Sequence, residues 1–244
     1  MNPFSVIIPS KNVSNLTQCI GAIRLRGETA RIIIVDDGLL DDERLVTIEN
    51  SPLADLHPPV TMIPGVKPFV FARNVNLGIK AAGTDDVVIM NDDALLETEL
   101  GLSRLAHDAA HNPEYGVIAA SVDSCGTPNQ MHCSVKTGLR VEKVMLAFIC
   151  VFIPRRILDE LGLLDERFAV NAGGEGRRGY GCEDDDFSWR VREAGYLLGV
   201  ENDVFVTHTQ LPSTFRTDRE HPADVKIHEA LFEKKWGRHP RCPK

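Results

Sequence analysis

Residues 71–94 read FARNVNLGIKAAGTDDVVIMNDDA, a stretch in which a helix pattern is followed directly by a strand pattern. Apolar side chains recur at helical spacing through residues 69–82, and residues 86–90 (DVVIM) form a short apolar run that ends in Asn91-Asp92-Asp93. Because this run is apolar at consecutive rather than alternate positions, the strand should be covered on both faces, as in a parallel sheet. The stretch therefore predicts an α/β fold.

The same alternation of strand and helix begins at the N-terminus. Residues 4–9 (FSVIIP) and 31–35 (RIIIV) are apolar, β-branched runs that predict strands, and residues 14–24 between them are compatible with a helix. A β-α-β opening is therefore expected. The other expected strands are 60–63, 116–121, 196–200 and 204–207, and the other expected helices are 100–110, 155–161, one opening near Glu183, and 224–235.

Acidic residues follow two of these predicted strands at the points where the strands end. They are Asp36-Asp37-Gly38 and Asn91-Asp92-Asp93. Either group alone would fit a turn or a helix N-cap. Two of them favour a binding site, because ligands of parallel sheets bind beyond the carboxyl ends of the strands. One or two carboxylates together with phosphate oxygens are the ligands that Mg²⁺ prefers, and Mn²⁺ would suit the same site.

The densest group of charges lies in residues 179–190, which read GYGCEDDDFSWR. A helix that begins near Glu183 favours acids in its first turn through the positive end of its dipole. This explains one or two acids, whereas four consecutive carboxylates repel one another. The excess favours a functional role, in which one carboxylate receives a proton or orients a hydroxyl. Five glycines among residues 173–181 predict a mobile loop that closes over a ligand.

Length and composition indicate a soluble globular protein with one large domain. The 244 residues carry a formal charge of -8, which argues against nonspecific nucleic-acid binding because such binding needs a basic face. The longest apolar stretch, residues 144–153, is about half of the roughly 20 residues that a membrane-spanning helix requires. The cysteines show no C-x-x-C spacing, and no basic stretch followed by a long apolar run opens the sequence. We therefore expect a cytoplasmic protein with reduced thiols and no membrane span.

Five segments occur in a characteristic order: SVIIPSKN (5–12), IIIVDDG (32–38), residues 71–94, the apolar run before IPRRILDELGLLDERF (153–168), and GYGCEDDDFSWRVREAGY (179–196). This order resembles family 2 glycosyltransferases of the GT-A fold over residues 4 to about 208. The resemblance implies a single α/β domain with a Rossmann-like nucleotide-binding half around a central, mostly parallel sheet and a smaller acceptor-binding half. The corresponding ranges are 1–95, 96–210, and a C-terminal tail with a helix at 211–244.

The resemblance implies a donor site at the strand ends. Asp37 matches the acid that binds the uracil edge, and Asp92 matches the first acid of a D-x-D pair, near the ribose. Asp93 matches the ligand of a Mn²⁺ or Mg²⁺ ion, and His208 lies where related enzymes often supply a histidine to the metal. Without the resemblance, His208 is a lone histidine at a strand end. The other donor-binding residues that the resemblance implies are Pro9 and Arg73.

The resemblance also implies a catalytic and acceptor site in the acidic segment. Asp184 matches the catalytic base, and Glu183 beside it is the second expected catalytic residue. GYGCEDDDF is similar to the G-W-G-x-E-D-D-D segment of β-1,4-galactosyltransferases, with Tyr180 in place of the tryptophan. Tyr180 keeps an aromatic platform for a sugar, while the change leaves the acceptor specificity open. Arg178 and Asp185 complete the implied acceptor-binding set.

The implied activity is transfer of a sugar, by default a hexose, from a nucleotide-diphosphate sugar to a hydroxyl of a glycan or glycoconjugate. UDP is the expected nucleotide, with GDP as the alternative, and inversion of anomeric configuration is expected, with retention as the alternative. A nucleotidyltransferase would share the β-α-β half, but residues 10–15 (SKNVSN) lack the glycine- and basic-rich loop that it needs. A non-catalytic sugar-nucleotide-binding module would not need both acidic clusters.

Overall fold

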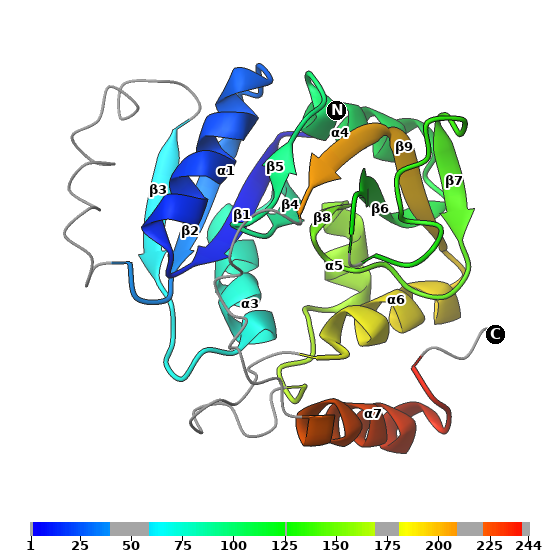
Figure 1. Ribbon diagram of the computed structural model, residues 1–244. Helices are drawn as coiled ribbons and strands as arrows, with labels where there is room; N and C mark the ends of the chain where they lie inside the picture. The colour runs from blue at the N-terminus through cyan, green and yellow to red at the C-terminus, as the bar shows by residue number, and fades with distance from the viewer. Residues whose placement is uncertain (1, 40–58, 125, 169–180, 209–221, 241–244) are drawn as a thin grey trace.

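A nine-stranded sheet organises the described residues, which are 2–39, 59–124, 126–168, 181–208 and 222–240 of this computed structural model (Figure 1). Eight strands form a continuous path, and the ninth, β7, pairs with β9 at one side. The path runs β3 (Val60–Pro64), β2 (Arg31–Asp36), β1 (Phe4–Ser10), β4 (Asp86–Met90), β8 (Cys150–Ile153), β6 (Tyr115–Val122), β9 (Leu197–Thr207) and β5 (Leu95–Leu96), and β7 spans Leu139–Glu142.

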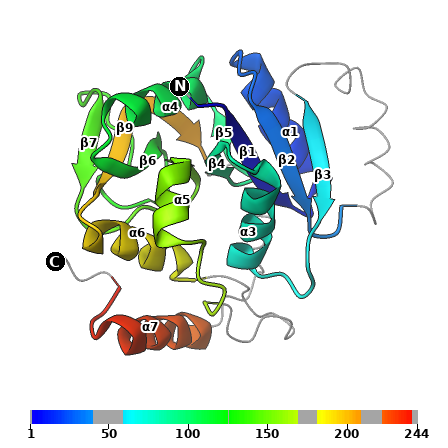
Figure 2. The same cartoon turned by 180° about the vertical axis from the view of Figure 1, so that it is seen from behind.

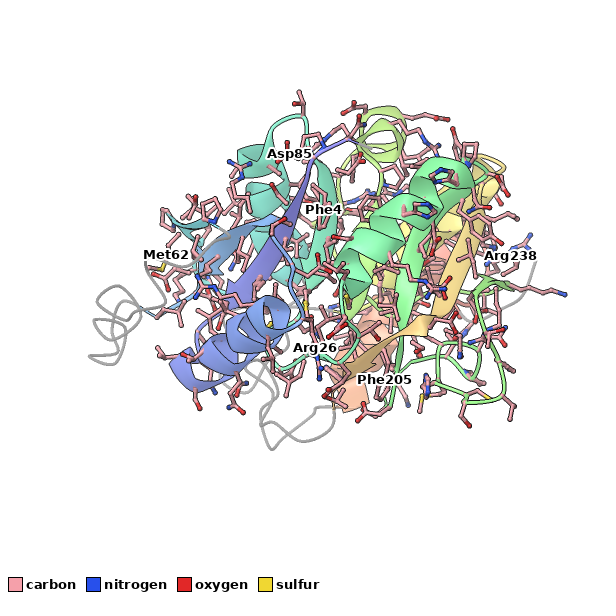
Figure 3. The ribbon with its side chains drawn as sticks, turned by 90° about the horizontal axis from the view of Figure 1, so that it is seen from above. Phe4, Arg26, Met62, Asp85, Phe205 and Arg238 are labelled. Carbon is pink, nitrogen blue, oxygen red and sulfur yellow. The ribbon has the colours of Figure 1, made fainter. Side chains whose placement is uncertain are left out.

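The strands β3, β2, β1 and β4 are all parallel to one another, whereas the rest of the sheet is mixed. Phe4 of β1 pairs with Asp86 at the start of β4, and Figure 3 shows Phe4 and Asp85 together at this amino end. The carboxyl ends of the parallel strands therefore meet at the opposite edge. This architecture confirms the predicted α/β fold and the parallel strand pairing in the first half of the chain.

Helices cover both faces of the sheet (Figures 1 and 2). On β1, Val6 and Ile8 pack in the core on one face, while Ile7 packs in the core on the other. Because both faces are buried, the strands are apolar at consecutive positions, as the sequence indicated. The first face is covered by α1 (Val13–Leu25) and α4 (Gly101–His111), and the second by α3 (Phe71–Ala82), α5 (Arg155–Leu161) and α6 (Glu183–Glu193).

The last helix, α7 (Pro222–Trp236), packs on α6 rather than on the sheet. Figure 1 shows it in red beneath α6, on the side of α6 that faces away from the strands. A small separate core joins the two helices, formed by Phe168, Trp189 and Phe232, with Trp236 packed against it. The C-terminal helix is therefore attached to the fold through α6.

One pair of expected strands is a single strand in the structure. The expected strands 196–200 and 204–207 are both part of β9, which begins at Leu197, because the polar residues between them form a bulge rather than a turn. At this bulge the register on β6 shifts between Ala120 and Ser121. The Asn202 amide binds the chain at Cys133, with Nδ2 donating to the carbonyl oxygen at 2.9 Å and Oδ1 accepting from the amide at 3.3 Å.

The short strands β5 and β7 are further differences from the expectation. No strand was expected at residues 95–96, and β7 begins at the end of a segment, up to residue 140, that was expected to be loop-rich. The expected helices all occur, with ends within two residues of the predicted ones where both ends were predicted.

The described cysteines Cys19, Cys133, Cys150 and Cys182 are free thiols. No helix in the described ranges combines the length and the apolar character that crossing a membrane requires.

We expect Gly78→Ala to destabilise the fold by about 1–3 kcal/mol, the usual cost of forcing extra atoms into a packed core. Gly78 lies where α3 crosses β1, and a Cβ there would come within 2.3 Å of Ile7 Cγ2. Gly21 of α1 is the matched control, because a Cβ there meets nothing within 4 Å. Gly21→Ala should stabilise by up to about 1 kcal/mol through helix propensity. Urea unfolding followed by circular dichroism measures both, and equal effects would contradict the close helix-to-strand packing.

Candidate active site

Polar side chains gather at the edge of the sheet where β1, β2 and β4 end. Ser10, the last residue of β1, donates its hydroxyl hydrogen bond to Asp92 Oδ2 at 2.5 Å. The amide of Asp37, just after β2, donates to the Ser10 carbonyl oxygen at 2.8 Å. Both aspartates are almost fully buried, with 1% and 2% of Asp37 and Asp92 exposed. The two acidic strand ends therefore converge, as expected from the parallel strand order.

The neighbouring Asp36 has a structural role in this edge. Its Oδ1 accepts hydrogen bonds from the amides of Gly38 at 2.7 Å and Leu39 at 2.5 Å. These bonds hold the turn that follows β2. Of the two consecutive acids, Asp36 thus closes the turn, which leaves Asp37 as the candidate for ligand binding.

The Asp37 carboxylate already has basic and amide partners in the structure. Its Oδ1 lies 3.2 Å from Lys67 Nζ and 3.4 Å from Asn74 Nδ2. Burial raises the pKa of Asp37, and the hydrogen bond and charge of Lys67 oppose that shift. The Lys67 side chain is 61% exposed and is therefore free to move into water, but the Asp37 side chain is 2% exposed, so its carboxylate would then need another hydrogen-bond donor. A ligand N–H that reaches Asp37 would compete with Lys67.

Asp93 and His208 lie side by side, although 115 positions separate them in the sequence. The distance between Asp93 Oδ1 and His208 Nε2 is 3.2 Å, and both side chains are largely buried. The pairing of Leu95 on β5 with Thr207 on β9 produces this contact, because these residues adjoin the aspartate and the histidine. The backbone amide of His208 also donates to Asp123 Oδ1 at 2.8 Å, which fixes the chain at this point.

The Asp93 and His208 pair fits two positions around a divalent cation. Adjacent ligands of an octahedral ion lie roughly 3 Å apart when each bond is about 2.1 Å, which agrees with the observed 3.2 Å. A carboxylate oxygen and an imidazole nitrogen are also suitable donors for such an ion. No group of three or more potential ligands occurs within the described residues. Phosphate oxygens of a bound nucleotide would have to supply further ligands.

Pro9 and Arg73, the other expected donor-binding residues, lie near the same region of the sheet. Pro9 is buried in β1 and pairs with Val35 of β2. Arg73, in the first turn of α3, donates from Nη2 to the carbonyl oxygens of Val66, at 3.1 Å, and Pro68. Its guanidinium thus braces the loop after β3, and its contact with a donor stays a prediction.

Helix α6 carries all four consecutive acids in its first turn, and these acids have different surroundings. Glu183 is 4% exposed and accepts a hydrogen bond from the Gly181 amide. Burial, and next the charge of Asp184, raise the pKa of Glu183 well above its usual value. Asp184 is half-buried, and its Oδ1 accepts from the Asp185 amide at 2.9 Å. The most accessible carboxylate of the four is therefore Asp184.

The fourth acid, Asp186, is completely buried and binds three donors. Its Oδ2 lies 3.0 Å from Arg190 Nε, one turn further along α6. Its Oδ1 accepts from Trp236 Nε1 at 2.8 Å and lies 2.7 Å from Lys235 Nζ. Asp186 therefore anchors α7 on α6, which is a structural task that the sequence interpretation did not assign to it.

A cavity of about 720 Å³ opens beside the start of α6. Residues 181–185 form one wall, and residues 126–129, 142–145 and 147 form another. His228 and Glu229 of α7 contribute a third. Glu142 holds two of the wall segments together, because its Oε2 accepts from Thr127 Oγ1 at 2.7 Å. Asp184 and Asp185 both line this cavity, which is large enough for a small-molecule ligand.

The segment before β8 links the wall of the cavity to the edge of the sheet. Ala147 lines the cavity, and the side-chain amide of Gln130 holds its backbone in place. Gln130 Nε2 donates to the Ala147 carbonyl oxygen, and Gln130 Oε1 accepts from the Ala147 amide, both at 2.9 Å. Two residues later, the Ile149 carbonyl oxygen accepts from the Asn91 amide at 2.9 Å. One short segment thus connects the cavity with the Asn91-Asp92-Asp93 strand end.

Two of the expected acceptor residues, Tyr180 and Arg178, lie outside the described residues, as does most of the glycine-rich loop 173–181. Sequence reasoning also missed several residues of the region. Ser10 could have been found, because it is the polar residue at the end of a buried strand. No sequence pattern points to Lys67, which lies in the irregular loop between β3 and α3, or to His228 and Glu229, which lie on an ordinary amphipathic helix.

Residues 5–147 match the family model described as glycosyl transferase family 2. The chain belongs to glycosyl transferase family 2. The matched region includes Asp37, Arg73, Asp92 and Asp93, and it ends before Asp184 and before α7. No curated protein matches the chain.

Three solved structures are similar to this family 2 chain over most of its length. GalNAc-T7 with UDP, GalNAc and Mn²⁺ has 14% identity and a TM-score of 0.67, over 95% of this chain and 48% of that one. TarS of S. aureus with UDP-GlcNAc has 14% identity and a TM-score of 0.68, over 96% and 66%. The mannosyltransferase PcManGT of Pyrobaculum calidifontis with GDP-Man and Mn²⁺ has 16% identity and a TM-score of 0.66, over 98% and 66%.

These similarities show that the fold is the GT-A fold, as the resemblance implied. The chain spans from about half to about two thirds of the length of these structures. At 14–16% identity, the similarity establishes the fold alone. The roles of individual residues are therefore argued from their surroundings in this chain.

We expect Glu183→Gln to keep the fold and to change how stability depends on pH. Because the folded-state pKa of Glu183 is raised, the folded protein holds a proton that the unfolded chain loses above about pH 4.3. Stability in the wild type therefore falls as the pH rises from there toward the raised folded pKa. Glutamine does not titrate, so the variant lacks this loss of stability. Its melting temperature should therefore rise relative to that of the wild type across this pH window. Scanning calorimetry between about pH 4.5 and 8 measures it, and parallel profiles would contradict a raised pKa.

Proposed function

We propose that the chain is a metal-dependent, inverting glycosyltransferase that moves a hexosyl group from a UDP-sugar to a hydroxyl of a glycan or glycoconjugate. The observation that carries this proposal is the contact of Asp93 with His208 at the carboxyl edge of a family 2 domain. Asp37 and Asp92 lie at the same edge, joined through Ser10. Asp184, on α6, lines the cavity whose wall is linked to this edge through residues 147–149.

The donor nucleotide would bind along the ends of β1, β2 and β4. Asp37 would accept a hydrogen bond from the ring N–H of uracil once Lys67 swings away, and Asp92 would lie near the ribose. Two of the similar structures hold UDP or a UDP-sugar, and a third holds GDP-mannose. Guanine also has a ring N–H, so GDP-sugars are the competing donor class.

Asp93 and His208 would hold the divalent cation, Mn²⁺ or Mg²⁺, between the protein and the diphosphate. Their arrangement fits this task because they offer an oxygen and a nitrogen 3.2 Å apart in a largely buried position. When bound, the ion would neutralise charge that develops on the departing diphosphate. Asn91 Nδ2 lies 3.4 Å from the same His208 Nε2, so this contact would have to give way when that nitrogen binds the ion.

Asp184 would act as the general base for the acceptor hydroxyl. It lines the cavity and is half-buried, whereas Asp186 is completely buried beneath Arg190, Lys235 and Trp236. Glu183 is a poor alternative, because its raised pKa favours the protonated form. An ionised Asp184 would take the hydroxyl proton as the acceptor oxygen attacks the anomeric carbon in line with the leaving diphosphate. Inversion of configuration follows from a single displacement of this kind.

A panel of UDP-, GDP- and dTDP-sugars with Mn²⁺ tests the proposed donor and metal. We expect hydrolysis or transfer with a UDP-sugar, tighter binding of UDP than of GDP, and loss of turnover in chelator. Asp93→Ala should remove the metal-dependent turnover and weaken Mn²⁺ binding in calorimetric titration. Full activity of this variant in chelator would exclude the proposed metal site, and tighter binding of GDP would exclude the uracil assignment.

Asp184→Asn should lower transfer by roughly two to four orders of magnitude, the usual contribution of general base catalysis. Donor and metal affinity should barely change, because the substitution keeps the shape of the side chain and removes its basicity. Glu183→Gln is the matched control and should retain most of the activity. Near-normal transfer by Asp184→Asn, together with loss of transfer in Asp185→Asn, would show that the base is misassigned.

A further inference from the structure

The C-terminal helix α7 lines the same cavity as Asp184, although it lies outside the part of the chain that matches the family model. His228 and Glu229 form its share of the cavity wall. Glu229 is partly exposed and lies 3.6 Å from His239 Nε2, whereas His228 is buried. The helix therefore brings a carboxylate to the cavity from a direction that neither the sheet nor α6 supplies.

The position of α7 is fixed at its far end by buried charge. Lys235 Nζ lies 2.7 Å from Asp186 Oδ1 and 2.8 Å from Asp165 Oδ2, so one ammonium joins α6, α7 and the segment after α5. Trp236 adds a third link through its indole N–H to Asp186. Arg190, also bound to Asp186, donates to the carbonyl oxygens of Leu161 and Leu163, both at 2.8 Å. We call Asp186, Lys235 and Trp236 the α7 anchor.

The near part of α7 touches the turn that leads into the acidic run. A Cβ on Gly181, whose φ is 145°, would lie 2.5 Å from His228 Nδ1, so the helix and this turn are in direct contact. The next residue, Cys182, has a left-handed backbone conformation with φ at 63°, which is uncommon for a residue with a side chain. Such conformations persist where the surrounding structure fixes them. Contact with α7 thus helps to set the conformation just before Asp184.

The cavity suits an uncharged sugar better than an anionic one. Among the described residues that line it, one, Lys143, carries an ammonium group, whereas five carry carboxyl groups: Glu142, Glu183, Asp184, Asp185 and Glu229. An anionic acceptor would meet like charges in a partly buried site. Apolar side chains are present as well, contributed by Pro128, Val144, Met145 and Ala147. Carboxylates that accept from hydroxyls, together with apolar side chains that cover C–H groups, match the two kinds of surface on a neutral sugar.

We propose that α7 is part of the acceptor site, that Glu229 binds hydroxyls of an uncharged glycoside acceptor, and that the α7 anchor positions Glu229 opposite Asp184. This proposal rests on the proposed function. The anchor lies six to seven residues beyond Glu229, roughly 9–11 Å along a rigid helix at 1.5 Å per residue. Because a helix of this length moves as one body, a shift at Lys235 or Trp236 displaces Glu229 from the cavity.

Glu229→Gln tests the acceptor contact, with Glu233→Gln as its matched control. Glu233 lies one turn further along α7, is exposed and does not line the cavity. The assay follows transfer from the donor that the nucleotide-sugar panel selects to p-nitrophenyl glucoside, galactoside, mannoside and N-acetylglucosaminide, with the glucuronide as an anionic probe. We expect the acceptor KM to rise about five- to tenfold in Glu229→Gln, because glutamine still accepts a hydrogen bond but lacks the negative charge that strengthens it. Donor hydrolysis in the absence of acceptor should stay within about twofold of wild type.

The double variant Lys235→Met with Trp236→Phe tests the anchor, with Lys234→Met as the control. Both replacements keep most of the side-chain volume, and they avoid Asp186→Asn, which could prevent folding by leaving two cations beneath it without their carboxylate. We expect the acceptor KM to rise by about the same factor as in Glu229→Gln, while donor hydrolysis is unchanged. Amide hydrogen exchange at residues 186–189 should accelerate at least about tenfold in the double variant and not in the control.

The outcomes separate the two proposals. A wild-type chain that neither hydrolyses nor transfers any nucleotide sugar overturns the proposed function, and unchanged exchange at residues 186–189 overturns the anchor whether or not the chain is active. An active wild type whose acceptor KM is the same in Glu229→Gln and Glu233→Gln overturns the acceptor contact alone. Preference for the glucuronide over every neutral glycoside overturns the uncharged acceptor. A selective rise in acceptor KM with unaltered donor hydrolysis supports the proposal.

Discussion

The parallel pairing of β1 with β2 on one side and β4 on the other is the constraint on which the rest of the structure depends. It places two acidic strand ends, more than fifty residues apart in the sequence, at one edge of the sheet. The Ser10 hydrogen bond to Asp92 then ties the end of β1 to the end of β4. The second half of the chain adds its contribution through β9, whose pairing with β5 brings His208 to Asp93. The candidate donor site is thus a product of strand order.

The four consecutive acids of α6 show how one sequence feature can serve several purposes. All four benefit from the positive end of the helix, yet their environments differ. Asp186 anchors α7, and Glu183 is buried with a raised pKa that favours its neutral form. This relieves part of the repulsion that four adjacent charges would cause. Asp184 and Asp185 then face the cavity. The run of acids is dense because structural and candidate catalytic positions adjoin one another.

The sequence predicted the parts of the fold that depend on local periodicity. β4 and α5 have the predicted bounds because their apolar patterns are uninterrupted. β9 was predicted as two strands, because the polar residues of its bulge have the composition of a turn. Only their pairing with β6 shows that the strand continues through them. The contact of Asp93 with His208 was anticipated only through the family resemblance. The anchoring by Asp186 and the cavity wall from α7 depend on contacts between distant residues, which no local pattern reports.

The aromatic core between α6 and α7 has a spectroscopic consequence. The chain contains two tryptophans, Trp189 and Trp236, and both belong to this region, with ring centroids 5.9 Å apart. Intrinsic tryptophan emission of the whole protein therefore originates at the junction of these two helices, while the central sheet contributes none. An unlabelled sample excited at the indole band would report undocking of the C-terminal helix separately from the loss of the sheet seen in far-ultraviolet dichroism. The native protein thus carries its own optical probe of the contact between α6 and α7.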